Sequence, residues 1–338
     1  MDIRPQKLEN FVGQKHMLDE LNVALHSSKK LNAPFPHTLM FGPPGLGKTT
    51  LAQIIANEME VPLISVMGAN IKTDRDLESL LVKIPRGGHD KYGVPVGKTT
   101  PAVIFIDEID NLKMPIMTLL HTVLEDGIIT LRRRKEGIIQ DVKCWIPQFT
   151  LIGATNYMGT LPKPLSDRFK IKLRFESYET NDIEKVIRFS SSKFGYRINK
   201  EAIKIIAERS RGVPRTANTF VEASIAVSVA NDRDKSITED DVIQMFRMKH
   251  IDNLGLTLLD RQLLKYLSGL SKPVGLKSVA QAVDEEPKTI ENTIEPWLIR
   301  QGLIIRTAQG REITDEGRRH LGREQGADEM ILPEIPQE

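Results

Sequence analysis

The chain has 338 residues, 40% of them hydrophobic and 27% charged, which is the composition of an ordinary soluble protein with room for two or three domains. Its formal net charge of +2 excludes binding to nucleic acid through overall basicity, so any DNA site must be a local patch. The single cysteine, Cys144, excludes a disulfide framework, and no apolar run approaches the roughly 20 residues that cross a bilayer. The first residues, MDIRPQKLEN, do not resemble a signal peptide, and we expect a cytoplasmic protein with no membrane contact.

Residues 1–176 alternate short apolar runs with amphipathic helical stretches. The apolar runs lack polar alternation, as parallel strands covered on both faces do. They are TLMFG (38–42), PLISV (62–66), AVIFID (102–107) and FTLIGAT (149–155). Helical spacing lies between them, for example at 48–59 and 113–126. This order predicts an α/β domain with a doubly wound parallel sheet.

Residues 127–149 predict a β-hairpin, in which IITLRRR and IIQDVKCWI flank a turn at Lys135-Glu136-Gly137. Its apolar residues suit contact with a partner protein, whereas the basic run from Arg132 to Lys135 suits phosphate. A hairpin that packs on its own domain, with a solvated basic tip, is a third interpretation.

The second half of the chain changes character. Residues 177–252 keep helical spacing but lose the strand runs, which predicts a small helical domain. Residues 253–322 predict three short helices followed by two short strands around a Gln-Gly turn in LIIRTAQGREIT, the pattern of a winged helix. The tail 323–338 is acidic with two prolines, and we expect it to be disordered.

The stretch GPPGLGKT (42–49) matches G-x-x-x-x-G-K-[ST] and lies between a predicted strand and a predicted helix. In this context glycines let backbone N–H groups surround a phosphate at a helix N-terminus, and a glycine-rich turn without a ligand is the weaker alternative. Lys48 is expected to reach the β- and γ-phosphates and Thr49 to ligate Mg²⁺. The nucleotide-binding residues predicted here are Gly42, Gly45, Leu46, Gly47, Lys48, Thr49 and Thr50.

Two acids, Asp107 and Glu108, follow the third predicted strand at the edge where α/β sheets bind ligands. We expect Asp107 to hold the Mg²⁺ shell and Glu108 to polarise the water that attacks the γ-phosphate. Their roles should differ because successive strand residues point in opposite directions. A strand followed by a solvated turn is the alternative.

The fourth predicted strand ends in Thr155 and Asn156, which we expect beside the two acids, where they would orient the attacking water. A strand-end cap is the alternative. Arg168 lies too far along the loop to serve its own site, but in a ring it would reach the γ-phosphate of the neighbouring subunit as an arginine finger. Arg215, at the start of a helix in SRGVPRTAN, would close over the same phosphate. For both arginines the alternative is a surface charge.

With these residues in place, the chain resembles the AAA+ ATPases, and within them the RuvB family of bacterial Holliday-junction branch-migration motors. The resemblance covers nearly all of residues 3–322. It is carried by RPQKLENFVGQ, FGPPGLGKTTLAQIIANEM, FIDEI, FTLIGATN, PLSDRF, SRGVPRTAN, VGLKSVAQAVDEEPKTIENTIEPWLIRQGLIIRT and RRHLG. The C-terminal stretch is the most specific, because many ATPases share P-loop motifs and few share this winged helix.

The resemblance implies an ATP hydrolase that uses ATP and Mg²⁺ to drive branch migration in recombination and repair. It places Lys48 and Thr49 on Walker A, Asp107 and Glu108 on Walker B, Asn156 at sensor 1, Arg168 on the arginine finger and Arg215 at sensor 2. Phe11, Val12, Tyr178 and Pro214 fall where the family encloses adenine. Arg311 falls on a wing arginine that touches the DNA backbone, and Arg306 is a further candidate for phosphate contact.

The same resemblance implies a hexameric ring on duplex DNA at four-way junctions. The hairpin 127–149 would then present apolar residues to a RuvA-like partner. Departures from the family suggest a divergent member, of the kind that a phage or mobile element carries. These are Asp110, Asn156, Lys170 and Gln309 at positions where the family usually has other residues, and the inserted stretch 86–99, expected to be a solvated loop.

Two other functions fit the motifs less closely. One is an AAA+ clamp-loader-like or protein-remodelling enzyme, whose ATPase activity a protein would stimulate. The other is an ATP-switched DNA-binding protein like a replication initiator, whose affinity for DNA would depend on base sequence.

Overall fold

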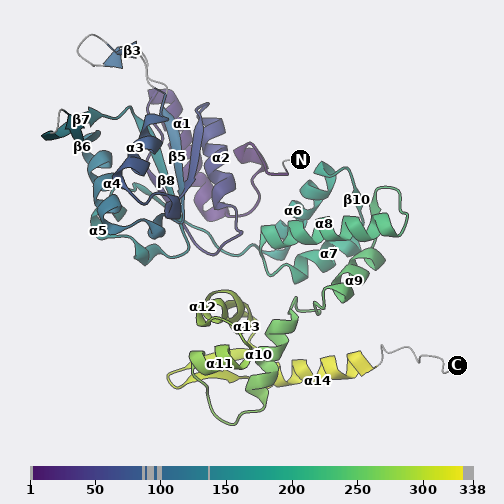
Figure 1. Cartoon of the computed structure of the whole chain (residues 1–338). Coiled ribbons are helices and arrows are strands. Elements are labelled where there is room, and N and C mark those ends of the chain that lie inside the picture. Colours follow the sequence, from purple (N-terminus) through teal and green to yellow (C-terminus); the bar gives the residue numbers. More distant parts are fainter. Residues whose placement is uncertain (1–2, 86–87, 90–94, 97–100, 136–137, 330–338) are drawn as a thin grey trace. The chain divides into compact units, whose positions relative to one another are not determined.

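A computed structural model of the chain describes residues 3–85, 88–89, 95–96, 101–135 and 138–329 (Figure 1). Its contacts form two compact units. The sheet unit comprises the chain up to Gly195 together with Gly212–Thr219, and the C-terminal unit comprises Tyr196–Arg211 together with the chain from Phe220 onward. The division runs through the region in which the sequence predicted a separate helical domain. No helix of the described residues is long and apolar enough to cross a membrane.

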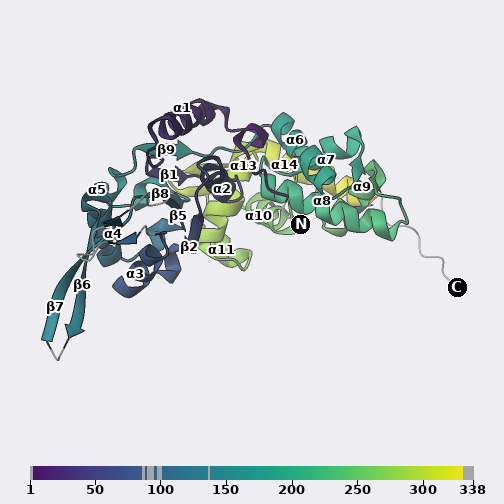
Figure 2. The same cartoon turned by 90° about the horizontal axis from the view of Figure 1, so that it is seen from above.

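A five-stranded parallel sheet lies at the centre of the sheet unit, with the strand order β2-β5-β8-β1-β9. Its strands are β1 (Thr38–Phe41), β2 (Leu63–Met67), β5 (Ala102–Asp107), β8 (Phe149–Thr155) and β9 (Ile171–Arg174). Helices α1 (Lys15–Leu31) and α2 (Lys48–Glu58) lie on one face, and α3 (Asp74–Val82) and α4 (Met114–Asp126) on the other (Figures 1 and 2). The predicted parallel α/β domain is therefore confirmed.

The edge strand β9 is the one strand of this sheet that the sequence did not predict. Its residues IKLR alternate between buried apolar and more exposed charged side chains, and it pairs only with β1. An alternating pattern is typical of a strand with one covered face, whereas the prediction relied on continuous apolar runs. The burial of Ile171 and Leu173 brings the end of the Arg168 loop back to the sheet.

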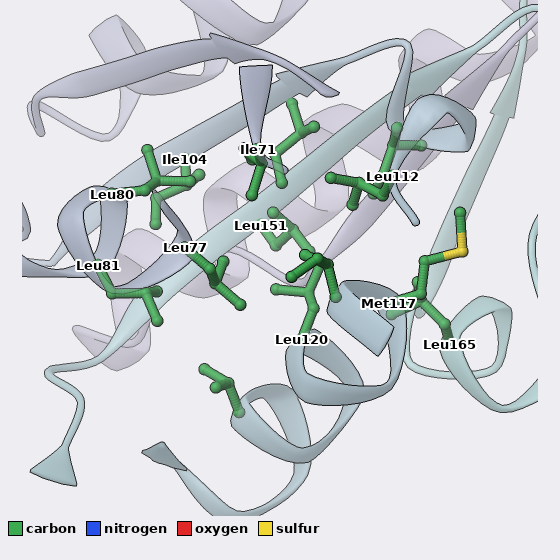
Figure 3. Close-up of a cluster of buried hydrophobic side chains, with 14 of the residues drawn as sticks. Ile71, Leu77, Leu80, Leu81, Ile104, Leu112, Met117, Leu120, Leu151 and Leu165 are labelled. Carbon is green, nitrogen blue, oxygen red and sulfur yellow. The ribbon is translucent and has the colours of Figure 1, made fainter. Parts of the chain in front are cut away.

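A layer of leucine and isoleucine side chains joins α3, α4 and the sheet (Figure 3). Leu77 and Leu81 of α3 meet Ile104 of β5 and Leu151 of β8, and all four are at most 1% exposed. Each fully buried side chain of this size stabilises the fold by about 1.5–3 kcal/mol. This layer fixes the helices that carry the functional loops.

The predicted hairpin is present: β6 (Ile128–Lys135) pairs antiparallel with β7 (Ile138–Trp145) and extends away from the sheet (Figure 2). Ile129 anchors its base at 1% exposed, and Trp145 is 66% exposed. The side chains of 131–141, including the basic run, and the turn at 136–137 lie outside the described residues. Of the inserted stretch 86–99, only the paired β3 (Gly88–His89) and β4 (Pro95–Val96) are described.

Four helices follow the sheet: α6 (Thr180–Lys193), α7 (Lys200–Arg209), α8 (Pro214–Ala230) and α9 (Glu239–Met248). Asn199 caps α7, and Thr238 and Asp241 form a capping box at α9, so polar residues at these starts satisfy otherwise unpaired N–H groups. A two-residue parallel pair, β10 (Arg197–Ile198) with β11 (Ser236–Ile237), was not predicted because runs this short carry no periodicity.

The last part of the chain folds as the predicted winged helix. Its helical elements are α10 (Leu258–Ser268), α11 (Leu276–Ala282), α12 (Pro287–Thr289), η5 (Ile290–Ile294) and α13 (Glu295–Arg300). The wing is β12 (Ile304–Thr307) paired antiparallel with β13 (Gly310–Ile313). Helix α14 (Asp315–Glu329) continues past residue 322, where the sequence predicted a disordered tail, because no proline interrupts the chain before Pro333. Residues 330–338 lie outside the described part.

Candidate functional site

The phosphate loop between β1 and α2 has the backbone that its glycines permit. Gly42, Gly45 and Gly47 have φ angles of +136°, +80° and +103°, which residues with a side chain rarely adopt. A Cβ atom on Gly42 would lie 2.4 Å from the carbonyl oxygen of Phe175, so the loop also needs glycine for space. The three glycines predicted from the motif therefore shape the cradle.

Lys48, the first residue of α2, has its ammonium group inside this loop. Its Nζ donates to the carbonyl oxygens of Gly42 at 2.5 Å and Pro43 at 3.0 Å, and to Asn156 Oδ1 at 3.4 Å. Burial lowers the pKa of Lys48, and the negative charge of Asp107 opposes that shift. The structure thus brings together the lysine and the asparagine that the sequence singled out, although it expected Asn156 beside the acids.

The two acids at the end of β5 differ for a reason that the sequence did not indicate. Asp107 ends the strand, and its Oδ1 accepts a hydrogen bond from the Glu108 N–H at 3.1 Å. Glu108 has left the strand and adopts a left-handed conformation with φ +51°, so strand alternation does not set its direction. Its carboxylate accepts from Asn111 Nδ2 at 2.9 Å. A Cβ atom on Gly68 would lie 2.2 Å from the Glu108 carbonyl oxygen, so this turn requires a glycine beside it.

Asp110 adds a third carboxylate to this region. Its Oδ1 is the buried side-chain oxygen for which the described residues offer no hydrogen-bond partner. The negative charge of Asp110 acts to raise the pKa of Lys48, as that of Asp107 does, which locates it near the phosphate loop. Oxygen atoms of this kind suit Mg²⁺, which usually takes one or two carboxylates together with substrate phosphates. The described residues contain no group of three or more His, Cys, Asp or Glu residues that could hold a metal ion.

The two polar residues at the end of β8, Thr155 and Asn156, have different contacts. Thr155 is 1% exposed, and its hydroxyl accepts from the N–H of Tyr157 at 3.2 Å and contacts Thr160 Oγ1 at 3.3 Å. It is therefore the cap of the turn that follows. Asn156 is the residue that reaches Lys48, as described above.

The start of α8 lies over the phosphate loop. The backbone N–H of Arg215 donates to the carbonyl oxygen of Gly45 at 3.3 Å, and the positive charge of Arg215 contributes to the lowered pKa of Lys48. A Cβ atom on Gly45 would lie 2.8 Å from Val213 and 3.2 Å from Arg215. The structure thus brings the second predicted arginine to the site.

A cavity partly open to solvent adjoins the phosphate loop at Gly47 and Thr50. All the residues that were expected to enclose adenine line it: Phe11, Val12, Tyr178 and Pro214. The hydroxyl of Tyr178 donates to the Leu46 carbonyl oxygen at 3.2 Å, and burial raises the pKa of Tyr178, so the phenol stays neutral.

Part of this cavity was missed from the sequence, namely the face formed by α6 and α8. It consists of Val186, Phe189, Ser190 and Asn218. Ser190 Oγ donates to Asn218 Oδ1 at 2.7 Å and joins the two helices. The spacing of three and four residues in α6 was a usable signal for one shared face, but not for what that face contacts.

Arg168 is not part of this cluster. It follows the short helix α5 (Lys163–Ser166), and its polar contacts are with Glu125 and His121 of α4. Its role at the phosphate loop of a neighbouring chain stays a prediction.

The two wing arginines predicted to contact DNA share an internal partner. Arg311 Nε donates to Glu295 Oε1 at 2.6 Å, and Arg306 Nη2 lies 2.6 Å from Glu295 Oε2. Glu295 is fully buried, and the side chain of Arg311 is 14% exposed against 42% for Arg306. The pairing joins the wing to α13. Sequence reasoning missed Glu295, because a buried acid has no sequence signature of its own, and DNA contact by either arginine stays a prediction.

Three families of known proteins match successive parts of the chain. Residues 3–175 match the family described as "Holliday junction DNA helicase RuvB P-loop domain", 178–252 the "RuvB AAA lid domain" and 253–322 the "RuvB C-terminal winged helix domain". The Holliday junction branch migration complex subunit RuvB of Bifidobacterium adolescentis is 36% identical over 323 residues, which are 95% of this chain and 85% of that protein.

Solved structures agree with these matches. The Holliday junction branch migration motor RuvB of Thermotoga maritima superposes with a TM-score of 0.79 at 32% identity, covering 95% of this chain and 98% of that one. A point mutant of the same RuvB gives 0.80 at 31% identity over 98% of this chain and 100% of that one. Nothing in these similarities supports an origin in a phage or mobile element.

Proposed function

The chain belongs to the RuvB family of Holliday junction branch migration motors, and from this membership we propose how its residues hydrolyse ATP and where they meet their partners. The chain is a P-loop ATPase that combines a parallel-sheet domain with an AAA lid and a winged helix, which favours the motor over an initiator or a clamp loader. The finer proposal is a hexameric ring in which ATP, bound with Mg²⁺, is hydrolysed between neighbouring subunits.

The observation that carries the proposal is the set of partners around Lys48. Neutral oxygens of Gly42, Pro43 and Asn156 surround its ammonium group. Phosphate oxygens would replace these partners favourably, because they carry negative charge and attract the ammonium group more strongly than neutral oxygens do. Lys48 would then hold the β- and γ-phosphates and free Asn156 to orient water.

The acids at the end of β5 would complete the site. Thr49, Asp107 and the unpartnered oxygen of Asp110 suit Mg²⁺, which would supply charge neutralisation at the phosphates. Glu108 would polarise the attacking water, and Asn111 would orient its carboxylate, to which it donates a hydrogen bond. The cavity beside Gly47 would take adenine.

Arg168 would complete the site of the next subunit, and Arg215 would sense the phosphate from within the same chain. Arg215 lies against Gly45, which supports this assignment, and the polar side-chain contacts of Arg168 among the described residues are with Glu125 and His121 of α4. Hydrolysis would then depend on ring assembly, which couples chemistry to movement along DNA.

The partners follow from the same membership. Duplex DNA at four-way junctions would contact the winged helix, and the hairpin 127–149 would bind a RuvA-like protein in the cytoplasm. Trp145 and Val142 of β7 are 66% and 40% exposed, and exposed apolar side chains of this kind support a protein contact. The relative from Bifidobacterium adolescentis is named as a subunit of a complex, which supports a multi-protein assembly.

The test of the proposed site uses two inactive variants. Arg168→Ala should bind ATP but not hydrolyse it, and mixing it with Lys48→Ala should restore part of the turnover, because each supplies what the other lacks. A synthetic four-way junction, incubated with ATP with and without a RuvA-like protein, should be converted to separated products. Normal hydrolysis by Arg168→Ala alone would remove the arginine from the proposed site, and binding without product formation would contradict the motor.

A further inference from the structure

Arg168 sits on a segment whose backbone is fixed against α4. Leu165 and Phe169, on either side of it, are 1% and 2% exposed, and Figure 3 shows Leu165 close to Met117 of α4. The backbone N–H of Arg168 donates to the Leu165 carbonyl oxygen at 3.1 Å. The backbone of Arg168 therefore has a well-defined position, and only the conformation of its long side chain is left to be fixed by other contacts.

Two residues of α4 set that side chain. Arg168 Nη2 lies 2.5 Å from Glu125 Oε1, and Arg168 Nε donates to His121 Nε2 at 3.2 Å. His121 and Glu125 are four residues apart and so lie on the same face of the helix, one turn from each other.

The contacts use one edge of the guanidinium group and spare the other. The group has five N–H donors in a planar fork, of which Nε donates to His121 and Nη2 forms the ion pair with Glu125. The opposite edge, which includes Nη1, has the geometry that grips two phosphate oxygens. Among the described residues no polar contact of Nη1 occurs, and the Arg168 side chain is 35% exposed. An arginine held in this way keeps its phosphate-binding edge available.

We propose that Glu125 and His121 are positioning residues that hold Arg168 with its free edge outward, ready for the γ-phosphate of a neighbouring subunit. The inference rests on the proposed role of Arg168 as an arginine finger. Neither residue would touch phosphate. Glu125 is 45% exposed, and ion pairs at this exposure add little to folding stability, so its contribution is to the geometry of the arginine. Holding the side chain beforehand avoids loss of its conformational entropy in each catalytic cycle.

The first test is the ATPase of Glu125→Ala, assayed with junction DNA. A catalytic group that is misplaced by about 1 Å can lose about 100-fold in rate, so we expect kcat to fall about 10- to 100-fold. KM for ATP should stay unchanged, because the nucleotide cavity of the same chain does not include α4. Glu208→Ala is the matched control: Glu208 is a carboxylate 50% exposed with a cation four residues away, and its loss should leave kcat unchanged.

A double-mutant cycle separates positioning from simple loss of structure. If Glu125 acts through Arg168, then adding Glu125→Ala to Arg168→Lys, which keeps a cation and a measurable residual rate, should cause much less further loss than it causes in the unmodified chain. An additive loss, or a melting temperature of Glu125→Ala well below that of Glu208→Ala, would contradict positioning. Glu125→Gln, which keeps an acceptor, should recover part of the rate, and His121→Ala should lower it less than Glu125→Ala does.

Mixed rings distinguish failure of this inference from failure of the proposed function. Glu125→Ala subunits keep an intact nucleotide site and Lys48→Ala subunits keep a held Arg168, so mixing should restore turnover. If Arg168→Ala is inactive but Glu125→Ala has normal kcat, the inference fails and the finger survives. If Arg168→Ala is itself normal, the finger proposal fails and takes the inference with it.

Discussion

The phosphate loop and the wing each contain a basic residue, Lys48 and Arg311, that the sequence predicted to bind phosphate. The internal partners of the two residues differ in charge. Lys48 is surrounded by neutral oxygens that a phosphate can replace. Arg311 is joined to the buried carboxylate of Glu295, which cannot be left alone without a large cost. A basic residue is available to a ligand only if its internal partners bind it more weakly than that ligand does.

The largest effect that tests this contrast is expected at Lys48. Replacing it with alanine removes a donor to the reacting phosphates, and we expect ATP hydrolysis to fall about 100-fold or more. The free energy of unfolding should change little, because the partners of Lys48 are neutral oxygens. ATPase assays and denaturant unfolding measure the two quantities, with Lys204→Ala on the surface of α7 as control. A large loss of stability in Lys48→Ala would show that Lys48, like Arg311, is needed for folding, and would contradict the contrast between the two residues.

At Arg311 the reverse is expected. Arg311→Ala leaves Glu295 with Arg306 alone, and we expect the free energy of unfolding to fall by about 3 kcal/mol, while ATP hydrolysis without DNA stays unchanged. Arg319→Ala, which breaks an exposed pair with Glu316, should cost less than about 1 kcal/mol. Denaturant unfolding of the full chain measures both. If Arg311→Ala weakens DNA binding without destabilising the chain, then the partner of Arg311 can be replaced by a phosphate as easily as those of Lys48, and the contrast between the two regions is wrong.

In the sheet unit, the partly buried side chain of His37 is a hydrogen-bond partner of the Leu151 backbone. Burial, and secondarily the charge of Lys170, lowers its pKa to about 4, and its Nδ1 accepts from the Leu151 N–H at 2.9 Å. The unfolded chain takes up this proton near pH 6.5, so the stabilisation is complete above pH 6.5 and is lost as pH falls toward 4. We expect a loss of about 2 kcal/mol between pH 7 and pH 5, measured by denaturant unfolding. In His37→Gln this part of the pH dependence should vanish; an identical profile would exclude His37 as its source.

The smallest effect is expected at the nucleotide cavity. Phe189→Ala removes apolar surface from the face of α6 that the sequence missed, and we expect KM for ATP to rise about three- to tenfold with kcat unchanged. Steady-state kinetics measure both constants. Phe194→Ala, at the C-terminal end of α6 and outside the cavity lining, is the control. A fall in kcat instead would mean that this face shapes the hydrolysis site rather than the binding of the base.

Features that depend on neighbouring residues were predictable from the sequence, whereas features that depend on residues far apart in the chain were not. The P-loop glycines and four of the sheet strands were predictable because backbone sterics and continuous apolar runs are local properties. The left-handed turn at Glu108 depends on Gly68, far away in sequence, and was not predictable. The edge strand β9 was missed because its alternating pattern resembles a surface segment.

Sequence alone determined four strands of the sheet, the phosphate loop, the acids that end β5 and the family resemblance, since each is recorded in short stretches of the chain. Tertiary structure decided which partners the charged side chains have. Arg168 contacts Glu125 and His121, Arg311 pairs with Glu295, and one oxygen of Asp110 has no partner within the part of the chain that the structure describes. The physical reason is that a charge is neutralised by whatever lies within a few ångströms in space, and chain folding brings those groups from distant parts of the sequence.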